Sequence, residues 1–398
     1  MREMLTSAWA HIQGFLFPML REEVGPLTPQ HERLVAVLDV ARIEAFVQMW
    51  PGLPGRPPAD RHALARAFVA KVVFNLPTTL ALIERLAADA VLRRLCGWES
   101  RRGLPSESTF SRAFAEFAAS SLPARVHEAL IQKTHKDRLV GHISRDATAI
   151  EARERPVKRS SSASCGSAPL KAQPAPAAAP RKRGRPKKGE AAAKKEPRRL
   201  ERQAGMTLAE MLADLPTACN TGAKRNAKGH VINWTGYKLH IDTADGDIPI
   251  SCLLTSASVH DSQAAIPLAS ITAGRVTSLY DLMDSAYDAP EIWDKSRALG
   301  HAPIIDAKLR RGCKAQAVAE ELARRRAGYE PAEAIRYNER TAAERVNGAL
   351  KDSYGGRTVR VRGHAKVLLP SHVRHPGIDR RTADAAGCLN ATLAVQLS

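Results

Sequence analysis

Apolar side chains near the C-terminal end of the chain recur at helical spacing. From residue 335 to residue 351, apolar positions collect on one side of a helix drawn at about 100° per residue, and polar positions collect on the other. The polar side holds Tyr337, Arg340, Glu344 and Lys351 within an arc of about 60°. The pattern predicts a helix that packs one face on a core and presents a polar stripe. Its apolar side holds Ile335, Ala342, Val346, Ala349 and Leu350.

Helical spacing also runs through residues 61–136. Three phenylalanines recur there at positions i, i+4 and i+7, namely Phe110, Phe114 and Phe117, and they are expected in a core. We therefore predict an N-terminal all-helical domain over 61–136, preceded in residues 1–60 by a short helical segment and a proline-rich linker. The short helices with basic tips can bind DNA as a helix-turn-helix does, or they can form a purely structural bundle.

In the second half of the chain, the spacing of apolar residues changes from that of a helix to that of a strand. A short alternating run contains Asp146, a hairpin pattern surrounds the Asp245-Gly246-Asp247 turn, and a buried strand pattern ends at Asp284. Helical and strand-like patterns then alternate up to residue 351. The fold class is thus α+β, with an α/β domain built from residues 137–157 and 230–398 and a connecting segment at 200–229.

Residues 158–199 interrupt this second domain with a different composition. They contain thirteen Lys and Arg against two Glu, a net charge of +11, and no aromatic residue. Such a segment buries too little apolar surface to fold, so we expect a disordered basic insert. Its centre, with Arg183 and Arg185 around Gly184, resembles an AT-hook, whose arginines enter a narrow A·T minor groove. The alternative is a basic tail that binds phosphates without sequence preference.

The whole chain is strongly basic. Its 398 residues carry 60 Lys and Arg against 41 Asp and Glu, a net charge of +19, which favours a nucleic acid partner over a membrane. The six cysteines contain no Cys-x2-Cys pair, and no apolar run is long enough to span a membrane. We expect a soluble protein of a reducing cytoplasm.

The polar stripe has the spacing Tyr-x2-Arg-x3-Glu-x6-Lys, which resembles the signature of DDE transposases from bacterial insertion sequences. Two upstream segments, Asn75-Leu-Pro-Thr-Thr79 and Pro105-Ser-Glu-Ser-Thr-Phe110, look like the N-terminal domain of the same group. The hairpin motif Gly236-Tyr-Lys-Leu-His240 and the following Ala257-Ser-Val-His-Asp-Ser262 are also similar to it. The resemblance covers most of residues 60–360.

The resemblance implies a ribonuclease H-like catalytic core whose three acids are Asp146, Asp284 and Glu344. The second acid is assigned through the motif Asp284-x-x-Tyr287. Ala286 departs from the family, which commonly has glycine there, so the turn after Asp284 has to form without positive φ. The acids Asp242, Asp245 and Asp247 are set aside because they lie in or next to a hairpin turn, where Asp is favoured for backbone reasons, and Asp281 because it lacks the following Tyr.

Three carboxylates suit phosphodiester chemistry, because hard oxygen ligands bind Mg²⁺ or Mn²⁺ and two such ions activate the nucleophile and the leaving oxygen. The resemblance further implies that Arg340 and Lys351 contact DNA phosphates and that Tyr337 contacts the transposon end. The expected partners are terminal-repeat DNA, target DNA and a second copy of the chain in the synaptic complex. The expected location is the bacterial nucleoid.

Several alternatives stay open at this stage. The polar stripe can be a solvated surface with an Arg340–Glu344 ion pair. The whole protein can be a DNA-binding regulator or a decayed transposase without catalysis, or a nuclease without strand transfer. His260 and Asp261 can orient a ligand or serve only the local structure.

Overall fold

The computed structural model describes residues 27–48, 58–135, 138–157, 197–225, 229–306, 314–353, 356–357 and 359–368. The basic insert predicted at 158–199 lies outside the described residues up to position 196, and Arg183 and Arg185 lie outside them too. Helix α8 (Arg199–Gln203) begins at the end of that insert. None of the described helices is long and apolar enough to cross a membrane.

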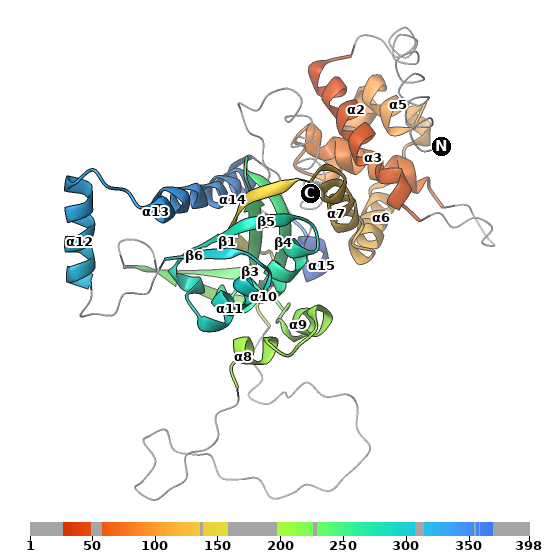
Figure 1. The fold of residues 1–398 in the computed structure, drawn as a ribbon. Coiled ribbons are helices and arrows are strands. Elements are labelled where there is room, and N and C mark those ends of the chain that lie inside the picture. The colour runs from red at the N-terminus through yellow and green to blue at the C-terminus, as the bar shows by residue number, and fades with distance from the viewer. Residues whose placement is uncertain are drawn as a thin grey trace, which may run out of the picture.

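The N-terminal region is helical, as predicted (Figure 1). Thr28, Thr78 and Asp89 accept hydrogen bonds from backbone N–H groups in the first turns of three of its helices, and Gly97 ends a helix at φ 108°. The three predicted core phenylalanines surround Phe68, with ring centroids 5.4 to 6.2 Å away. The elements are α2 (Pro29–Ala41), η1 (Ile43–Phe46), α3 (Arg61–Val73), α4 (Thr79–Ala88), α5 (Ala90–Cys96), η2 (Arg101–Gly103), α6 (Glu107–Ala119) and α7 (Leu122–His135).

A mixed sheet forms the second half of the molecule, in the order β2-β3-β1-β5-β6, with β4 also paired to β3. Strand β1 is antiparallel to β3 and parallel to β5, and β5 is parallel to β6. The predicted hairpin is present as β3 and β4, joined by the turn at residues 245–247. The strands are β1 (Leu139–Glu151), β2 (Asn220–Arg225), β3 (Val231–Ala244), β4 (Ile248–Ser256), β5 (Thr277–Met283) and β6 (Ala302–Ile305).

Helices cover both faces of this sheet (Figure 1). Thr272 of α10 contacts Asp242 of β3, which is in register with Arg145, whereas Asn347 of α14 contacts Asp146, the next residue of β1. Successive side chains of a strand point to opposite faces, so α10 and α14 lie on opposite sides of the sheet. The remaining elements are α9 (Leu208–Asp214), α10 (Ser262–Ala273), η3 (Ser285–Tyr287), α11 (Pro290–Ala298), α12 (Lys314–Arg326), α13 (Ala332–Tyr337), η4 (Asn338–Arg340), α14 (Thr341–Ser353) and α15 (His364–Val367).

The C-terminal helix differs in one respect from the expectation. Ala342, Val346 and Leu350 are buried as predicted, but the side chain of Ile335 is 54 % exposed. The single helix expected over 335–351 is divided by the 3-10 turn η4 between α13 and α14. A 3-10 turn has three residues per turn instead of 3.6, so it changes the direction in which the preceding side chains point.

The helical region and the sheet share one hydrophobic core. Val140 and Ile143 of β1 and Ile250 of β4 belong to the same cluster as the helical residues. At this junction His127 of α7 donates from Nε2 to the Pro249 carbonyl oxygen, 3.0 Å away. Burial lowers the pKa of His127 to about 3, so the ring is neutral and makes this bond without a buried charge.

Candidate active site

Asp146 lies in the middle of β1, and Asp284 directly follows β5, at the point where the pairing of these two parallel strands ends. The register of β1 and β5 ends with Arg145 paired with Met283, Asp146 and Asp284 each follow directly, and the charge of Asp284 acts on Asp146. Neighbouring strands are about 4.8 Å apart, and paired residues point to the same face, so the two carboxylates are neighbours on one side of the sheet. The sheet therefore joins two acids that are 138 positions apart in the sequence.

The turn after Asp284 forms without positive φ at Ala286, as the sequence predicts. The Asp284 Oδ1 atom accepts a hydrogen bond from the Ala286 N–H at 2.9 Å, which caps the short helix η3. Ala286 adopts negative φ within η3, so glycine is not needed at this position. The turn directs Tyr287 inward, where its side chain is buried.

Helix α14 lies over Asp146 and is fixed there by polar contacts with the sheet. Asn347 Nδ2 donates to Asp146 Oδ2 at 2.9 Å. Arg345 makes a bidentate ion pair with Asp247 of the β3–β4 turn, at 2.7 and 2.9 Å. Ser144 Oγ of β1 donates to the Glu339 carbonyl oxygen, 3.2 Å away, just before α14 begins. The helix that carries Glu344 is thus held on the same face as Asp146 and Asp284.

Arg340 and Glu344 form the ion pair that their spacing allows, with Arg340 Nη2 2.5 Å from Glu344 Oε1. Burial tends to lower the pKa of the Arg340 guanidinium. Four neighbouring side chains outweigh this effect and raise the pKa above its ordinary value: Tyr337, Glu344, Asp146 and Asp284. The guanidinium therefore lies within electrostatic reach of all three predicted acids. Glu344 is 53 % exposed at its side chain, so this pair faces solvent.

Basic side chains lie near Asp146. Burial raises the pKa of Asp146, the neighbouring Asp284 adds to this, and Arg340 and Lys224 oppose it. Burial lowers the pKa of Lys351, as do Lys224 and Arg357, whereas Asp146 opposes that shift. Lys224 of β2 and Lys351 of α14 are therefore both close enough to Asp146 to influence its charge. The site combines two adjacent carboxylates with a positive border.

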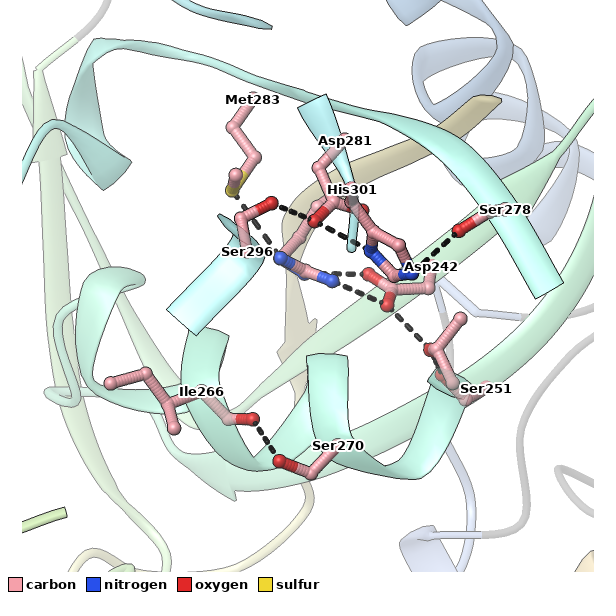
Figure 2. Close-up of polar contacts among 11 residues, drawn as sticks. Asp242, Ser251, Ile266, Ser270, Ser278, Asp281, Met283, Ser296 and His301 are labelled. Carbon is pink, nitrogen blue, oxygen red and sulfur yellow. Dashed lines mark hydrogen bonds and ion pairs between the residues drawn. The ribbon is translucent and has the colours of Figure 1, made fainter. Parts of the chain in front are cut away.

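The opposite face of the sheet holds a buried polar network (Figure 2). Arg145 forms a bidentate pair with Asp242, both bonds being 2.7 Å long, and Thr272 Oγ1 donates to Asp242 Oδ2 at 2.6 Å. Burial opposes the charge of Arg145, but Asp242 and Asp281 outweigh it and raise its pKa. Asp242 lies next to the hairpin turn, as predicted, but within β3, and its carboxylate pairs with a buried arginine instead of shaping the turn.

A second group in Figure 2 surrounds Asp281, whose Oδ2 atom accepts hydrogen bonds from Ser296 Oγ and from His301 Nδ1, the latter 3.1 Å away. Burial tends to raise the pKa of Asp281, but His301, Arg145 and Ser296 hold it below the ordinary value. This carboxylate is buried, and its Oδ2 atom has two partners. Its contacts fix β5 just before Asp284.

Two family models match the chain. One, described as Transposase domain (DUF772), matches residues 23–116, and the other, described as Transposase DDE domain, matches residues 212–369. Together they span more than half of the chain, and both describe transposases. The chain belongs to the DDE transposases. The family predicted from the sequence is thereby confirmed, while the four-residue signature stays a prediction.

The two matches cover the transposase unevenly. The DDE match contains Asp284 and Glu344, whereas Asp146 lies before its first residue. The assignment of Asp146 therefore depends on its place in the sheet beside Asp284. The comparisons with curated proteins and with solved structures gave no match.

DDE transposases generally use divalent metal ions, and the residues at this site fit such an ion. Adjacent carboxylates supply the hard oxygen ligands that Mg²⁺ prefers, and a cation would relieve the repulsion that Asp284 exerts on Asp146. Within the described ranges, no three carboxylate, imidazole or thiolate side chains lie close enough together to hold a metal ion as they stand. The carboxylate of Glu344 is engaged by Arg340 in this structure.

Three other candidate residues, Tyr337, His260 and Asp261, make local contacts with neighbouring side chains. Tyr337 is half-buried, with the Arg340 guanidinium 5.7 Å from its ring centroid. Asp261 forms an ion pair with Lys238 of β3 at 2.9 Å, and His260 Nδ1 lies 2.8 Å from Ser262 Oγ. These contacts give His260 and Asp261 local structural roles, and a ligand-orienting role for them stays a hypothesis.

Two residues of the site were not anticipated from the sequence. Asn347 lies three positions after Glu344, inside the predicted helix, but an asparagine there carries no signal of its own. Lys224 falls in the segment assigned as a connection, because Asn220–Arg225 lacks the apolar alternation of a strand. Only the pairing of β2 with β3 reveals where Lys224 lies.

Proposed function

We propose that this transposase cuts DNA at the ends of an insertion sequence and joins the freed 3′-hydroxyl group to target DNA. The observation that supports the proposal most strongly is that Asp146 and Asp284, which follow the last pair of β1 and β5, lie close together beneath the helix that carries Glu344. The strand order supports a ribonuclease H-like core, because β1 lies between antiparallel β3 and parallel β5.

In this proposal Asp146, Asp284 and Glu344 hold two Mg²⁺ or Mn²⁺ ions. Bound there, such ions activate the attacking water or 3′-hydroxyl and stabilise the leaving oxygen. Glu344 becomes available as a ligand once its ion pair with Arg340 opens. A DNA phosphate offers Arg340 a replacement partner of the same charge, and its guanidinium can hold that phosphate in a bidentate manner.

The proposed DNA contacts extend beyond the catalytic face. Lys351 binds a phosphate of the DNA backbone as a point charge, and Tyr337 contacts the transposon end. The N-terminal helical region binds the terminal repeat. Arg183 and Arg185 of the basic insert enter the minor groove of A·T-rich DNA. Two copies of the chain hold the two ends in a synaptic complex, and the DNA affinity keeps the protein on the nucleoid.

The proposal is tested on a short linear DNA that carries the terminal repeat of the element, incubated with Mg²⁺ and a second, target DNA. We expect cleavage at the repeat boundary and joined products of higher mass. Cleavage without joining would indicate a nuclease, and binding without cleavage would indicate a regulator or a decayed transposase.

Replacement of Arg340 or Lys351 by Ala should weaken cleavage about 10²-fold, because the phosphate is then misplaced relative to the metal ligands. Added Mg²⁺ should not repair the loss, since Asp146, Asp284 and Glu344 remain. The measurement pairs a gel shift with cleavage on the same DNA. Arg324→Ala is the charge-matched control, because Arg324 is exposed on α12 and pairs only weakly with Glu320 at 3.8 Å. If both variants cleave like wild type, the polar stripe is a solvated surface.

A further inference from the structure

Asn347 is buried between α14 and β1, beside a predicted metal ligand. Its side chain is three residues after Glu344 on α14, and only 7 % of the residue is exposed. The Nδ2 atom donates to Asp146 Oδ2 at 2.9 Å. The Oδ1 atom is also buried, and no partner for it exists in the described part of the chain. A buried amide that leaves its oxygen unpaired calls for an explanation, because such atoms are normally bonded.

Attachment of α14 to the sheet does not explain this amide. The helix is already held by the Arg345–Asp247 pair, by the Ser144 contact to the Glu339 carbonyl, and by the apolar side chains of Val346 and Leu350. A leucine at position 347 would fill about the same volume without burying an unpaired oxygen. The one polar group that the amide serves is therefore the Asp146 carboxylate.

An amide can hold the Asp146 carboxylate in place without neutralising it. A lysine or arginine next to Asp146 would neutralise the carboxylate and compete with a cation for it. An asparagine donates a hydrogen bond without carrying charge, so it fixes the rotation of the carboxylate and leaves its charge available. Ligating carboxylates are commonly held by hydrogen bonds of this kind, and loss of such a partner typically weakens metal binding 10- to 100-fold.

We infer that Asn347 is a positioning residue of the metal site: its Nδ2 fixes the orientation in which the Asp146 carboxylate meets a cation, and this role accounts for a buried amide whose Oδ1 has no partner among the described residues. The inference rests on the proposed function, because it assigns Asn347 a role at the site where Asp146 and Asp284 hold the ion. It adds a residue of the chain that lies outside the four-residue signature.

The test compares wild type with Asn347→Leu and Asn347→Ser in the full-length protein. The first readout is the affinity for Mn²⁺, measured by electron paramagnetic resonance of the free ion. The second is the Mg²⁺ concentration that gives half-maximal cleavage of the terminal-repeat DNA. We expect both variants to bind Mn²⁺ at least 10-fold more weakly and to need a correspondingly higher Mg²⁺ concentration, while their melting temperatures show that they fold.

Gly348→Ala is the matched control. It changes the next residue of α14, and an added Cβ there meets no atom within 4 Å, so Mn²⁺ affinity and the Mg²⁺ midpoint should stay at their wild-type values. Folded Asn347 variants with wild-type values in both readouts would overturn the inference while leaving the proposed function intact. A wild-type protein that neither binds Mn²⁺ nor cleaves the DNA would overturn the proposed function, and the inference with it.

Discussion

Replacement of Asp146, Asp284 or Glu344 by Ala should reduce DNA cleavage and strand transfer at least about 10³-fold while leaving binding of the terminal repeat largely intact. Metal ions contribute several kcal/mol to stabilisation of the charged transition state, and each 1.4 kcal/mol corresponds to a factor of ten in rate. The DNA contacts come from other side chains, so they survive the loss of one carboxylate. A gel shift and a cleavage assay on the same DNA measure the two effects.

Asp352→Ala provides the control for these substitutions. Asp352 lies on the same helix as Glu344, and its carboxylate forms an exposed ion pair with Arg357. Its loss removes the same charge from α14 without touching the predicted ligands, so cleavage should stay near wild type. An alanine variant of Asp146, Asp284 or Glu344 that cleaves within tenfold of wild type would remove that residue from the site.

Asp242→Ala should destabilise the protein by about 3 to 5 kcal/mol, because it leaves the buried guanidinium of Arg145 without its counter-charge. Both side chains of this pair are at most 2 % exposed, so water cannot take the place of the carboxylate. Urea denaturation followed by tryptophan fluorescence measures the loss, and Trp234, which is buried on β3, is a suitable reporter.

The double variant Arg145→Met/Asp242→Leu separates the effect of a lost partner from the net contribution of the pair. Replacement of both charges by apolar side chains of similar volume is often close to neutral, so the double variant should be clearly more stable than Asp242→Ala. Asp352→Ala, which breaks an exposed pair, should cost less than about 1 kcal/mol. An Asp242→Ala protein as stable as Asp352→Ala would mean that Arg145 does not depend on Asp242.

Sequence patterns were informative wherever local periodicity and burial agreed. The helical N-terminal region, the β3–β4 hairpin and the strand ending at Asp284 all have apolar positions at the spacing of the element that forms. The buried positions Ala342, Val346 and Leu350 follow the same rule. Ile335 does not, because the 3-10 turn η4 starts a new helix whose direction periodicity alone cannot predict.

Contacts between residues far apart in the sequence could not be predicted from local patterns. Asp242 stands three residues before a turn, where local preference suggests a turn residue, but its partner Arg145 is 97 positions away. Only the register of β1 with β3 brings the two together. The same holds for Asn347 and Asp146, which are 201 positions apart, and for Lys224 on a strand with no apolar alternation.

The buried network and the proposed site lie on opposite faces of β1. Arg145 points toward Asp242 and α10, and Asp146 points toward α14, because consecutive residues of β1 alternate in direction. The network fixes β1 against β3 from one side, and the contacts of Asp281 fix β5 next to it. Rigid strands on which the ligands are placed favour a site whose carboxylates are already neighbours before a cation binds.

The most direct test of metal binding by these carboxylates is the cation preference of Asp284→Cys. Thiolate is a softer ligand than carboxylate, and Mg²⁺ binds it poorly, whereas Mn²⁺ accepts sulfur more readily. Cleavage of the terminal-repeat DNA by wild type and by Asp284→Cys is measured in Mg²⁺ and in Mn²⁺ at equal concentration. If Asp284 is a ligand, the cysteine variant is inactive in Mg²⁺ and regains cleavage in Mn²⁺, while wild type is active in both. An Asp284→Cys protein with the same ratio of activities in Mg²⁺ and Mn²⁺ as wild type would contradict the account.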